Sequence, residues 1–324
     1  MDISTLRIVY MGTPEFAVAP LERMLDANFN VVAVITAPDR PAGRGKKIRI
    51  SAVKEFAMTR GLTILQPENL KDPGFTAQLG QLAPDLQVVV AFRMLPEQVW
   101  AIPPMGTFNL HASLLPDYRG AAPINHVIIN GESRTGVTSF MIDAQIDTGN
   151  ILLREETPIG EAETAGELHD RLMTMGADLV LKTIQQLARG SLKVRSQDEW
   201  IKPGSVLRKA PKIHKEDCRI DWTRPGKDIL NLIRGLSPFP GAFTTLNREG
   251  AGGMLCKIYS SAFEPAIHSH PAGSINTDGK KWLKVAVKDG FLSIHTLQQE
   301  GRRSMEIGDF LAGTNLTSFQ PRFS

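Results

Sequence analysis

The sequence is poor in the residues that support covalent or metal-based stabilisation. Cys218 and Cys256 are the two cysteines among 324 residues, too few for a disulfide framework and typical of reduced thiols. No group of cysteines and histidines has the spacing of a zinc site, so we expect no bound metal. We therefore expect a cytoplasmic protein that is stabilised mainly by hydrophobic burial.

Long apolar runs are also missing. No stretch approaches the roughly 20 apolar residues of a membrane-spanning helix, and the opening residues, MDISTLRIVYMG, do not resemble a secretory signal. We expect no membrane partner.

The hydrophobic fraction of 42% is ordinary for a globular protein, and the length exceeds the usual size of a single core. The chain is therefore predicted to form two domains.

The first 189 residues alternate between strand-like and helix-like patterns. Apolar runs at 7–11, 31–35, 62–65, 86–92 and 107–110 predict strands, with helical patterns between several of them. This alternation predicts a doubly wound, mostly parallel Rossmann-like α/β sheet. We expect residues 136–142 to continue the sheet and residues 165–187 to form a long amphipathic helix.

The remainder of the chain has a different pattern. Residues 190–207 are rich in polar residues, glycine and proline, which predicts a linker. A helix is expected at 227–236, and short β-type runs with intervening turns indicate a small OB-like barrel. We therefore expect a first domain at 1–189 and a second at 208–324.

A dinucleotide cofactor is not expected. Gly12 ends the first predicted strand, but the segment GTPEFA lacks the second and third glycines of the G-x-G-x-x-G fingerprint. We interpret Thr13 as the N-cap of the following helix, with Pro14 as its first residue.

Positive charge is distributed unevenly. Residues 208–324 carry 17 Lys and Arg against 11 Asp and Glu, a balance of +6, whereas the first 207 residues carry −3. The segment 39–49, DRPAGRGKKIR, is a second basic feature, which we call the basic arm. It follows the second predicted strand, where a parallel sheet commonly binds ligands. A solvated loop is one interpretation, and an arm that orders on phosphate is the other.

Residues 109–149 contain the candidate catalytic groups. Side chains alternate across a strand, so Asn109 and His111 should lie roughly 7 Å apart on one face, next to a loop rich in proline and glycine. Asp147 follows another apolar run, with Asp143 as an alternative that spacing does not exclude. A base, a hydrogen-bond donor and a carboxylate are the components of an acyl-transfer site.

Several motifs resemble those of one family. The segments RIVYMGTPEFA, PDRPAGRGKK, NLHASLLPDYRGAAP, GESRTGVTSFMIDAQIDTG and KIHKEDCRIDW are similar to those of the 10-formyltetrahydrofolate-dependent formyltransferases. The resemblance covers nearly the whole chain and is strongest over residues 7–150. It implies that Asn109, His111 and Asp147 are catalytic, which selects Asp147 over Asp143. It also implies a folate-contacting loop made of Ser113, Leu114, Leu115 and Pro116.

The resemblance also implies a reaction. The chain is most similar to members that move the formyl group of 10-formyltetrahydrofolate to the α-amine of methionine on initiator tRNA. Asn109 and His111 would donate hydrogen bonds to the carbonyl oxygen, and His111 with Asp147 would relay a proton. The OB-like domain would add tRNA contacts. In the basic arm, the residues expected to contact the acceptor stem are Arg40, Arg44, Lys46 and Lys47.

Three alternatives remain open. A folate-dependent hydrolase would use the same three groups with water as the acceptor, and related transferases act on a small amine or an amino sugar. A non-catalytic RNA-binding protein is the third. A basic arm and a basic second domain favour the tRNA substrate over water or a small amine, and we expect a monomer.

One segment departs from the family pattern. Many members have AYGLILP before the strand that carries the catalytic asparagine, whereas this chain has the shorter AFRMLP, with Arg93 near the position of the glycine. That stretch lines the folate pocket in the family. Arg93 would either point away from the pocket or contact the glutamate tail of the folate.

Overall fold

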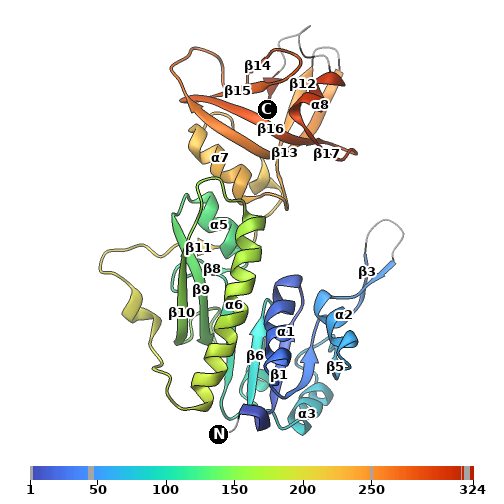
Figure 1. Ribbon diagram of the computed structural model, residues 1–324, viewed down its shortest axis with the longest axis vertical. Helices are drawn as coiled ribbons and strands as arrows, with labels where there is room; N and C mark the ends of the chain where they lie inside the picture. The colour runs from blue at the N-terminus through green and yellow to red at the C-terminus, as the bar shows by residue number, and fades with distance from the viewer. Residues whose placement is uncertain (1–2, 43–46, 249–250, 315, 317–321) are drawn as a thin grey trace. The chain divides into compact units, whose positions relative to one another are not determined.

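The computed structural model describes residues 3–42, 47–248, 251–314, 316 and 322–324 (Figure 1). The chain forms two compact units, each assembled from several segments. The first consists of Met1–Pro123, Thr135–Pro158 and His169–Lys209. The second consists of Ile124–Arg134, Ile159–Leu168 and Ala210–Ser324. The second unit thus includes two short segments from within the sequence of the first.

The first unit is built around a seven-stranded sheet with the order β10-β9-β7-β6-β1-β2-β5. The pairs β7–β6, β6–β1, β1–β2 and β2–β5 are parallel, which confirms the predicted mostly parallel α/β sheet. The strand bounds are Ile8–Gly12 for β1, Val31–Ile35 for β2, Ile64–Leu65 for β5, Leu86–Val90 for β6, Thr107–His111 for β7, Arg134–Met141 for β9 and Ile151–Pro158 for β10.

The strand expected at 136–142 is present and continues the sheet, but it does not run parallel to its neighbour β7. β9 pairs antiparallel with β7, so that His111 lies opposite Thr138. A parallel neighbour needs a crossover that returns the chain to the other end of the sheet. The segment between β7 and β9 contains β8 (Arg119–Gly120) and the short helix α5 (Pro123–Ile129), and it rejoins the sheet at the end where β7 stops.

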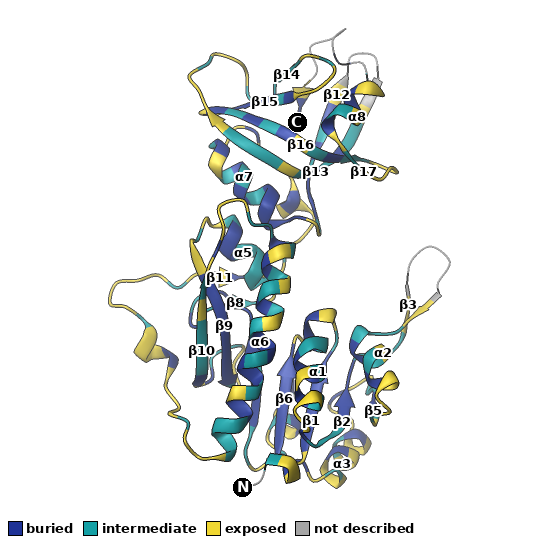
Figure 2. Cartoon of the chain, viewed as in Figure 1, coloured by how far each residue is buried: buried dark blue, intermediate teal, exposed yellow. Residues whose placement is uncertain are grey.

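Helices cover the sheet, and each of the longer helices has buried residues on one side and exposed residues on the other (Figure 2). Two N-caps follow from local sequence, because the Ser51 hydroxyl accepts from the Lys54 amide and the Asp72 carboxylate accepts from the Gly74 amide. The helices of this part of the chain are α1 (Val18–Asp26), α2 (Ala52–Thr59), α3 (Pro73–Gln81), α4 (Glu97–Trp100) and α6 (Ala165–Ala188).

The predicted cap at Thr13 was wrong. Pro14 is extended, and a 3-10 turn at Glu15–Ala17 precedes α1. The buried Tyr10 hydroxyl donates to the Ala17 carbonyl at 2.6 Å, which holds this turn against β1. Gly12 is needed here for close packing, because a Cβ at this position would lie 2.6 Å from the Cβ of Ala17.

Helix α6 packs closely on the strand that carries the candidate site. Gly176 faces Leu110, leaving no room for a Cβ between them. The hydroxyls of Thr183 and Ser139 are 2.8 Å apart and buried, which joins α6 to β9. These contacts fix the positions of β7 and β9 in the sheet.

The chain after α6 returns to the first unit. Arg195 forms a β-bridge with Ile151, and a 3-10 turn follows at Gln197–Trp200, which we call the Gln197 turn. Ser196 and Glu199 close its start with a capping box. The short strand β11 (Lys209–Ala210) then pairs with β8.

The second unit contains a nearly closed antiparallel barrel. Its sheet has the order β14-β15-β16-β13-β12-β18, and a bridge between Ser274 and Arg322 joins the two edges. This confirms the expected small barrel. The strands are β12 (Ala242–Arg248), β13 (Ala251–Pro265), β14 (Ile275–Thr277), β15 (Leu283–Val287), β16 (Gly290–Gln299), β17 (Ser304–Glu306) and β18 (Arg322–Phe323).

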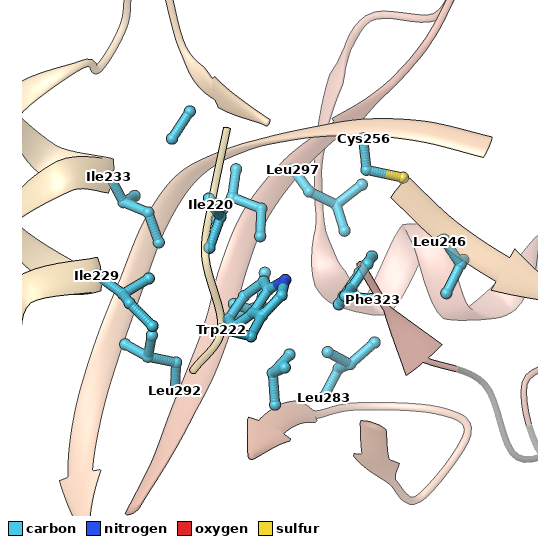
Figure 3. Close-up of a cluster of buried hydrophobic side chains, with 14 of the residues drawn as sticks. Ile220, Trp222, Ile229, Ile233, Leu246, Cys256, Leu283, Leu292, Leu297 and Phe323 are labelled. Atoms are coloured by element: carbon cyan, nitrogen blue, oxygen red, sulfur yellow. The ribbon is translucent and has the colours of Figure 1, made fainter. Parts of the chain in front are cut away.

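The interior of the second unit is aromatic and aliphatic (Figure 3). The rings of Trp222 and Phe323 stack at 5.6 Å, and the Trp222 indole donates to the Thr244 hydroxyl at 3.0 Å. Helices α7 (Gly226–Gly235) and α8 (Ile307–Ala312) contribute apolar side chains to this core. Cys218 and Cys256 are both buried. Within the described parts of the chain, no helix is long and apolar enough to cross a membrane.

Candidate active site

The carboxyl end of β7 presents Asn109 and His111. The strand lies between β6 and β9, with Asn109 opposite Val89 on one side and Phe140 on the other. Alternation along the strand directs both polar side chains to the same face. His111 is 6% exposed, so its ring orientation is determined by the protein rather than by solvent.

The tautomer of His111 follows from its hydrogen bond. Its Nε2 lies 2.8 Å from the carbonyl oxygen of Tyr118. A carbonyl oxygen accepts and does not donate, so Nε2 carries a proton. In the neutral ring Nδ1 is therefore unprotonated and able to accept a proton. The edge of the ring contacts Phe140, with the ring centroids 6.4 Å apart.

Asp147 faces the unprotonated nitrogen. Its Oδ2 lies 4.0 Å from His111 Nδ1, and both side chains are largely buried. The same Oδ2 accepts a hydrogen bond from the Gly120 amide at 3.0 Å. A separation of 4.0 Å is too long for a direct hydrogen bond, but it is short enough for a water or a substrate atom to bridge the two groups. A proton that reaches Nδ1 is stabilised by the carboxylate.

Asp143 has a different environment. Its Oδ1 accepts hydrogen bonds from the Gln145 amide at 2.9 Å and from the Thr148 hydroxyl at 2.8 Å. Its carboxylate thus closes the turn of its own loop. Asp147 therefore lies beside His111, whereas the Asp143 carboxylate is engaged in hydrogen bonds within its own loop.

Asn109 has an unused acceptor. Its Oδ1 is buried and has no hydrogen-bond partner within the described parts of the chain. A buried acceptor without a partner costs free energy unless a ligand satisfies it. The Asn109 Oδ1 can therefore accept a hydrogen bond from a substrate N–H, and the NH₂ group of the same amide is the part that can donate to a substrate oxygen.

Comparison with known proteins identifies the family of this chain. Residues 6–184 match the family described as formyl transferase, and residues 212–315 match the formyl transferase C-terminal domain. The chain belongs to the formyl transferase family. The resemblance seen in its motifs is thereby confirmed.

Relatives within the formyl transferase family match along nearly the whole chain. A protein of Parabacteroides distasonis named methionyl-tRNA formyltransferase is 52% identical, covering 97% of this chain and 97% of the relative. A protein of the same name from Flavobacterium johnsoniae is 50% identical, covering 95% and 96%.

Solved structures show the same fold at lower identity. An N-formyltransferase from Helicobacter canadensis, in complex with folinic acid and dTDP-3-aminofucose, has a TM-score of 0.63 and 21% identity, covering 91% of this chain and all of that one. HypX from Aquifex aeolicus in complex with tetrahydrofolic acid has a TM-score of 0.62 and 17% identity, covering 95% and 48%.

The predicted folate loop of this formyl transferase is largely buried. Ser113 donates from its hydroxyl to the Asp117 carbonyl at 2.7 Å, and its own carbonyl accepts from the Thr138 hydroxyl. Leu115 packs with Phe140 in a small apolar cluster. Pro116 is also buried, whereas Leu114 is partly exposed. A ligand at this loop would therefore meet Leu114 and backbone atoms rather than the other three side chains.

The basic arm is a hairpin in its described part. β3 (Arg40–Ala42) pairs antiparallel with β4 (Lys47–Arg49), and Arg40 is exposed. Lys47 belongs to β4, while Arg44 and Lys46 lie outside the described residues. Hydrogen bonds from Gln66 and Lys54 lower the pKa of the Asp39 carboxyl at the start of the hairpin. The basic arm thus begins at a carboxylate, Asp39, that is held by hydrogen bonds from Lys54 and Gln66.

Arg93 is held by the backbone of a neighbouring loop. Its guanidinium donates to the carbonyls of Pro67 and Glu68, and it lies over the Phe92 ring at 5.5 Å. Burial lowers the pKa of the guanidinium, and the charge of Arg40 lowers it further. Two of its nitrogens are occupied within the protein, which favours the alternative in which Arg93 points away from the folate.

The sequence did not reveal the groups that hold this site in place. The Tyr118 carbonyl and the Gly120 amide are backbone atoms with no residue signature. The Gln197 side chain, which binds the Asp147 loop from 50 residues away, lies in a polar segment that predicted a linker. A polar turn with a strong capping motif, Ser196 to Glu199, was the available signal that this segment is ordered.

Proposed function

We propose that this formyl transferase moves a formyl group from N10 of 10-formyltetrahydrofolate to the α-amine of methionine esterified to initiator tRNA, in the cytoplasm. The match along nearly the whole chain to relatives named methionyl-tRNA formyltransferase carries this proposal. Solved relatives of the same fold bind folinic acid or tetrahydrofolic acid, which supports a folate as the donor.

The chemistry moves one proton from the attacking amine to N10 and requires no covalent bond to the enzyme. The neutral amine attacks the formyl carbon, a new C–N bond forms, and negative charge develops on the carbonyl oxygen. The Asn109 amide donates to that oxygen. His111 Nδ1 accepts the proton of the attacking nitrogen, directly or through a water, while Asp147 stabilises the imidazolium. The C–N10 bond then breaks and the proton passes to N10.

The tautomer of His111 assigns different roles to its two nitrogens. Nε2 is committed to the Tyr118 carbonyl, so it holds the ring and does not meet the substrate. Nδ1 faces Asp147 and moves the proton. We therefore assign the donation to the carbonyl oxygen to Asn109 first, with His111 able to assist only after Nδ1 is protonated.

A three-way acceptor assay tests this function. The protein is supplied with 10-formyltetrahydrofolate and with methionine-charged initiator tRNA, methionine-charged elongator tRNA or no acceptor. We expect rapid formylation of the initiator and much slower formylation of the elongator. Donor hydrolysis at a similar rate without tRNA would identify a hydrolase and contradict the proposal.

We assign the basic arm to the tRNA acceptor stem, with Arg40, Arg44, Lys46 and Lys47 as the contacting residues. Arg44→Ala should raise the KM for charged tRNA and leave the Kd for the folate unchanged, because the arm would neutralise phosphates. Loss of one phosphate contact should reduce the slope of log affinity against log salt by about 1.

The control for Arg44→Ala is Lys71→Ala, which removes one positive charge from the first unit outside the arm. Binding is measured by filter retention or fluorescence over a salt series. A parallel fall in folate affinity would assign the arm to the donor site, and an unchanged salt slope would mean that Arg44 makes no phosphate contact.

A further inference from the structure

Gln197 is the buried member of an otherwise exposed turn. It is 2% exposed, whereas Asp198, Glu199 and Trp200, the other members of the Gln197 turn, are exposed. A side-chain amide removed from water destabilises the folded protein unless its donors and its acceptor have hydrogen-bond partners. The partners that satisfy it therefore indicate what this side chain does.

All the hydrogen bonds of the Gln197 amide connect to the segments that form the candidate active site. Its Nε2 donates to the carbonyls of Asp147 and Gly149, both at 2.9 Å. Its Oε1 accepts from Nε and Nη2 of Arg119, at 3.0 and 2.6 Å. The side chain thus links the loop that carries Asp147 to strand β8.

The backbone at Asp147 needs such support. Asp147 has a φ of 56°, in the left-handed region that a residue with a side chain rarely adopts. A backbone conformation of this kind persists where the surrounding bonds determine it. The two hydrogen bonds from Gln197 hold the carbonyl of Asp147 itself and the carbonyl two residues later.

The other end of the link positions the partner of the carboxylate. Arg119 is bound by Gln197, and the next residue, Gly120, donates its amide proton to Asp147 Oδ2 at 3.0 Å. One side chain therefore fixes the backbone that carries the carboxylate and the strand that supplies its hydrogen-bond donor. Together these contacts determine where the carboxylate lies relative to His111 Nδ1.

We propose that Gln197 is a positioning residue for Asp147, setting the place of its carboxylate beside His111 and acting on turnover rather than on substrate binding. The inference rests on the proposed roles of His111 and Asp147. Gln197 itself touches no reacting atom. A displacement of about 1 Å in a catalytic group can cost on the order of 10²-fold in rate, so loss of this link should be measurable.

Two substitutions separate the donor and acceptor functions of the amide. Gln197→Ala removes both. Gln197→Glu retains an acceptor for Arg119 but loses the donors and places negative charge against the carbonyls of Asp147 and Gly149. Both should lower kcat by about 10- to 100-fold, with the KM for folate and for charged tRNA within about twofold of the parent. Asp198→Ala, on the same turn, is the matched control and should retain the parental kcat.

A double-mutant cycle with Asp147→Ala distinguishes positioning from general stabilisation. If Gln197 acts through the Asp147 carboxylate, Gln197→Ala should change the residual kcat of the Asp147→Ala protein by less than about twofold. Equal effects of Gln197→Ala with and without the carboxylate would overturn the proposal. So would a KM change that accounts for the loss of activity.

A second variant covers the case in which Gln197→Ala fails to fold. Arg119→Lys keeps the charge and leaves Gln197 in place, but it loses the two-pronged contact to Oε1. Like Gln197→Ala, Arg119→Lys should lower kcat and leave KM unchanged. Full activity in folded Arg119→Lys and Gln197→Glu proteins would refute the positioning role. Full activity of Asp147→Ala would instead refute the proposed site on which the inference rests.

Discussion

Replacing His111 or Asp147 by alanine should reduce formyl transfer by about 10²- to 10⁴-fold, the usual effect of losing one positioned acid or base. The expectation follows from the geometry, in which His111 Nδ1 and Asp147 Oδ2 lie 4.0 Å apart. Among the described residues, neither His111 nor Asp147 forms a second carboxylate–imidazole pair. Single-turnover formylation of charged initiator tRNA, with saturating enzyme, measures the step directly.

Near-isosteric variants control for packing. His111 is buried, so its removal to alanine also leaves a cavity. Asp147→Asn retains an oxygen that can accept from the Gly120 amide and removes only the charge, and His111→Gln retains a donor near the Tyr118 carbonyl. Thermal unfolding and tRNA binding should change little in these two proteins. Activity within threefold of the parent in either would contradict the catalytic assignment.

The sequence predicted well those features that depend on local rules. Alternation across a strand of a few residues is enough to place Asn109 and His111 on one face, and the strand expected at 107–110 is present as β7. The alternation of strands and helices predicted the parallel sheet, because short crossovers allow few other arrangements. The short β-type runs after residue 240, with turns between them, predicted the barrel.

Features that depend on distant contacts could not be predicted in this way. Asp143 and Asp147 are equivalent by spacing, and what distinguishes them is a hydrogen bond from Gly120, 27 residues earlier. The direction of β9 could not be predicted, because an apolar run does not reveal which end of the sheet it enters. Gln197 was missed because an isolated glutamine among polar residues looks the same whether it is solvated or buried.

The position of Arg93 shows the same limit. The sequence indicated a cation close to the expected folate pocket, and two orientations were compatible with it. The choice depends on the carbonyls of Pro67 and Glu68, which accept from the guanidinium. Backbone acceptors have no side-chain signature, so only the folded structure reveals them.

Asn109→Ala should lower kcat by about 10²- to 10³-fold, as expected when one donor to a developing oxyanion is lost. The donor in this role is the NH₂ group of the amide, while its buried Oδ1, which has no partner in the described part of the protein, can accept from a substrate N–H. We expect the KM for charged tRNA to stay near the parental value, because the interaction strengthens only as charge develops on the oxygen.

Asn109→Asp gives the sharper test, since it keeps the shape of the side chain and exchanges an amide donor for a carboxylate. A negative charge beside the developing oxyanion should make this variant slower than Asn109→Ala, although it is the more conservative change in volume. The order of the two rates, measured in single turnovers at several pH values, tests the role of the amide. If Asn109→Asp were as fast as the parent, the amide would serve to pack β7, and the oxyanion donor would have to be sought elsewhere in the site.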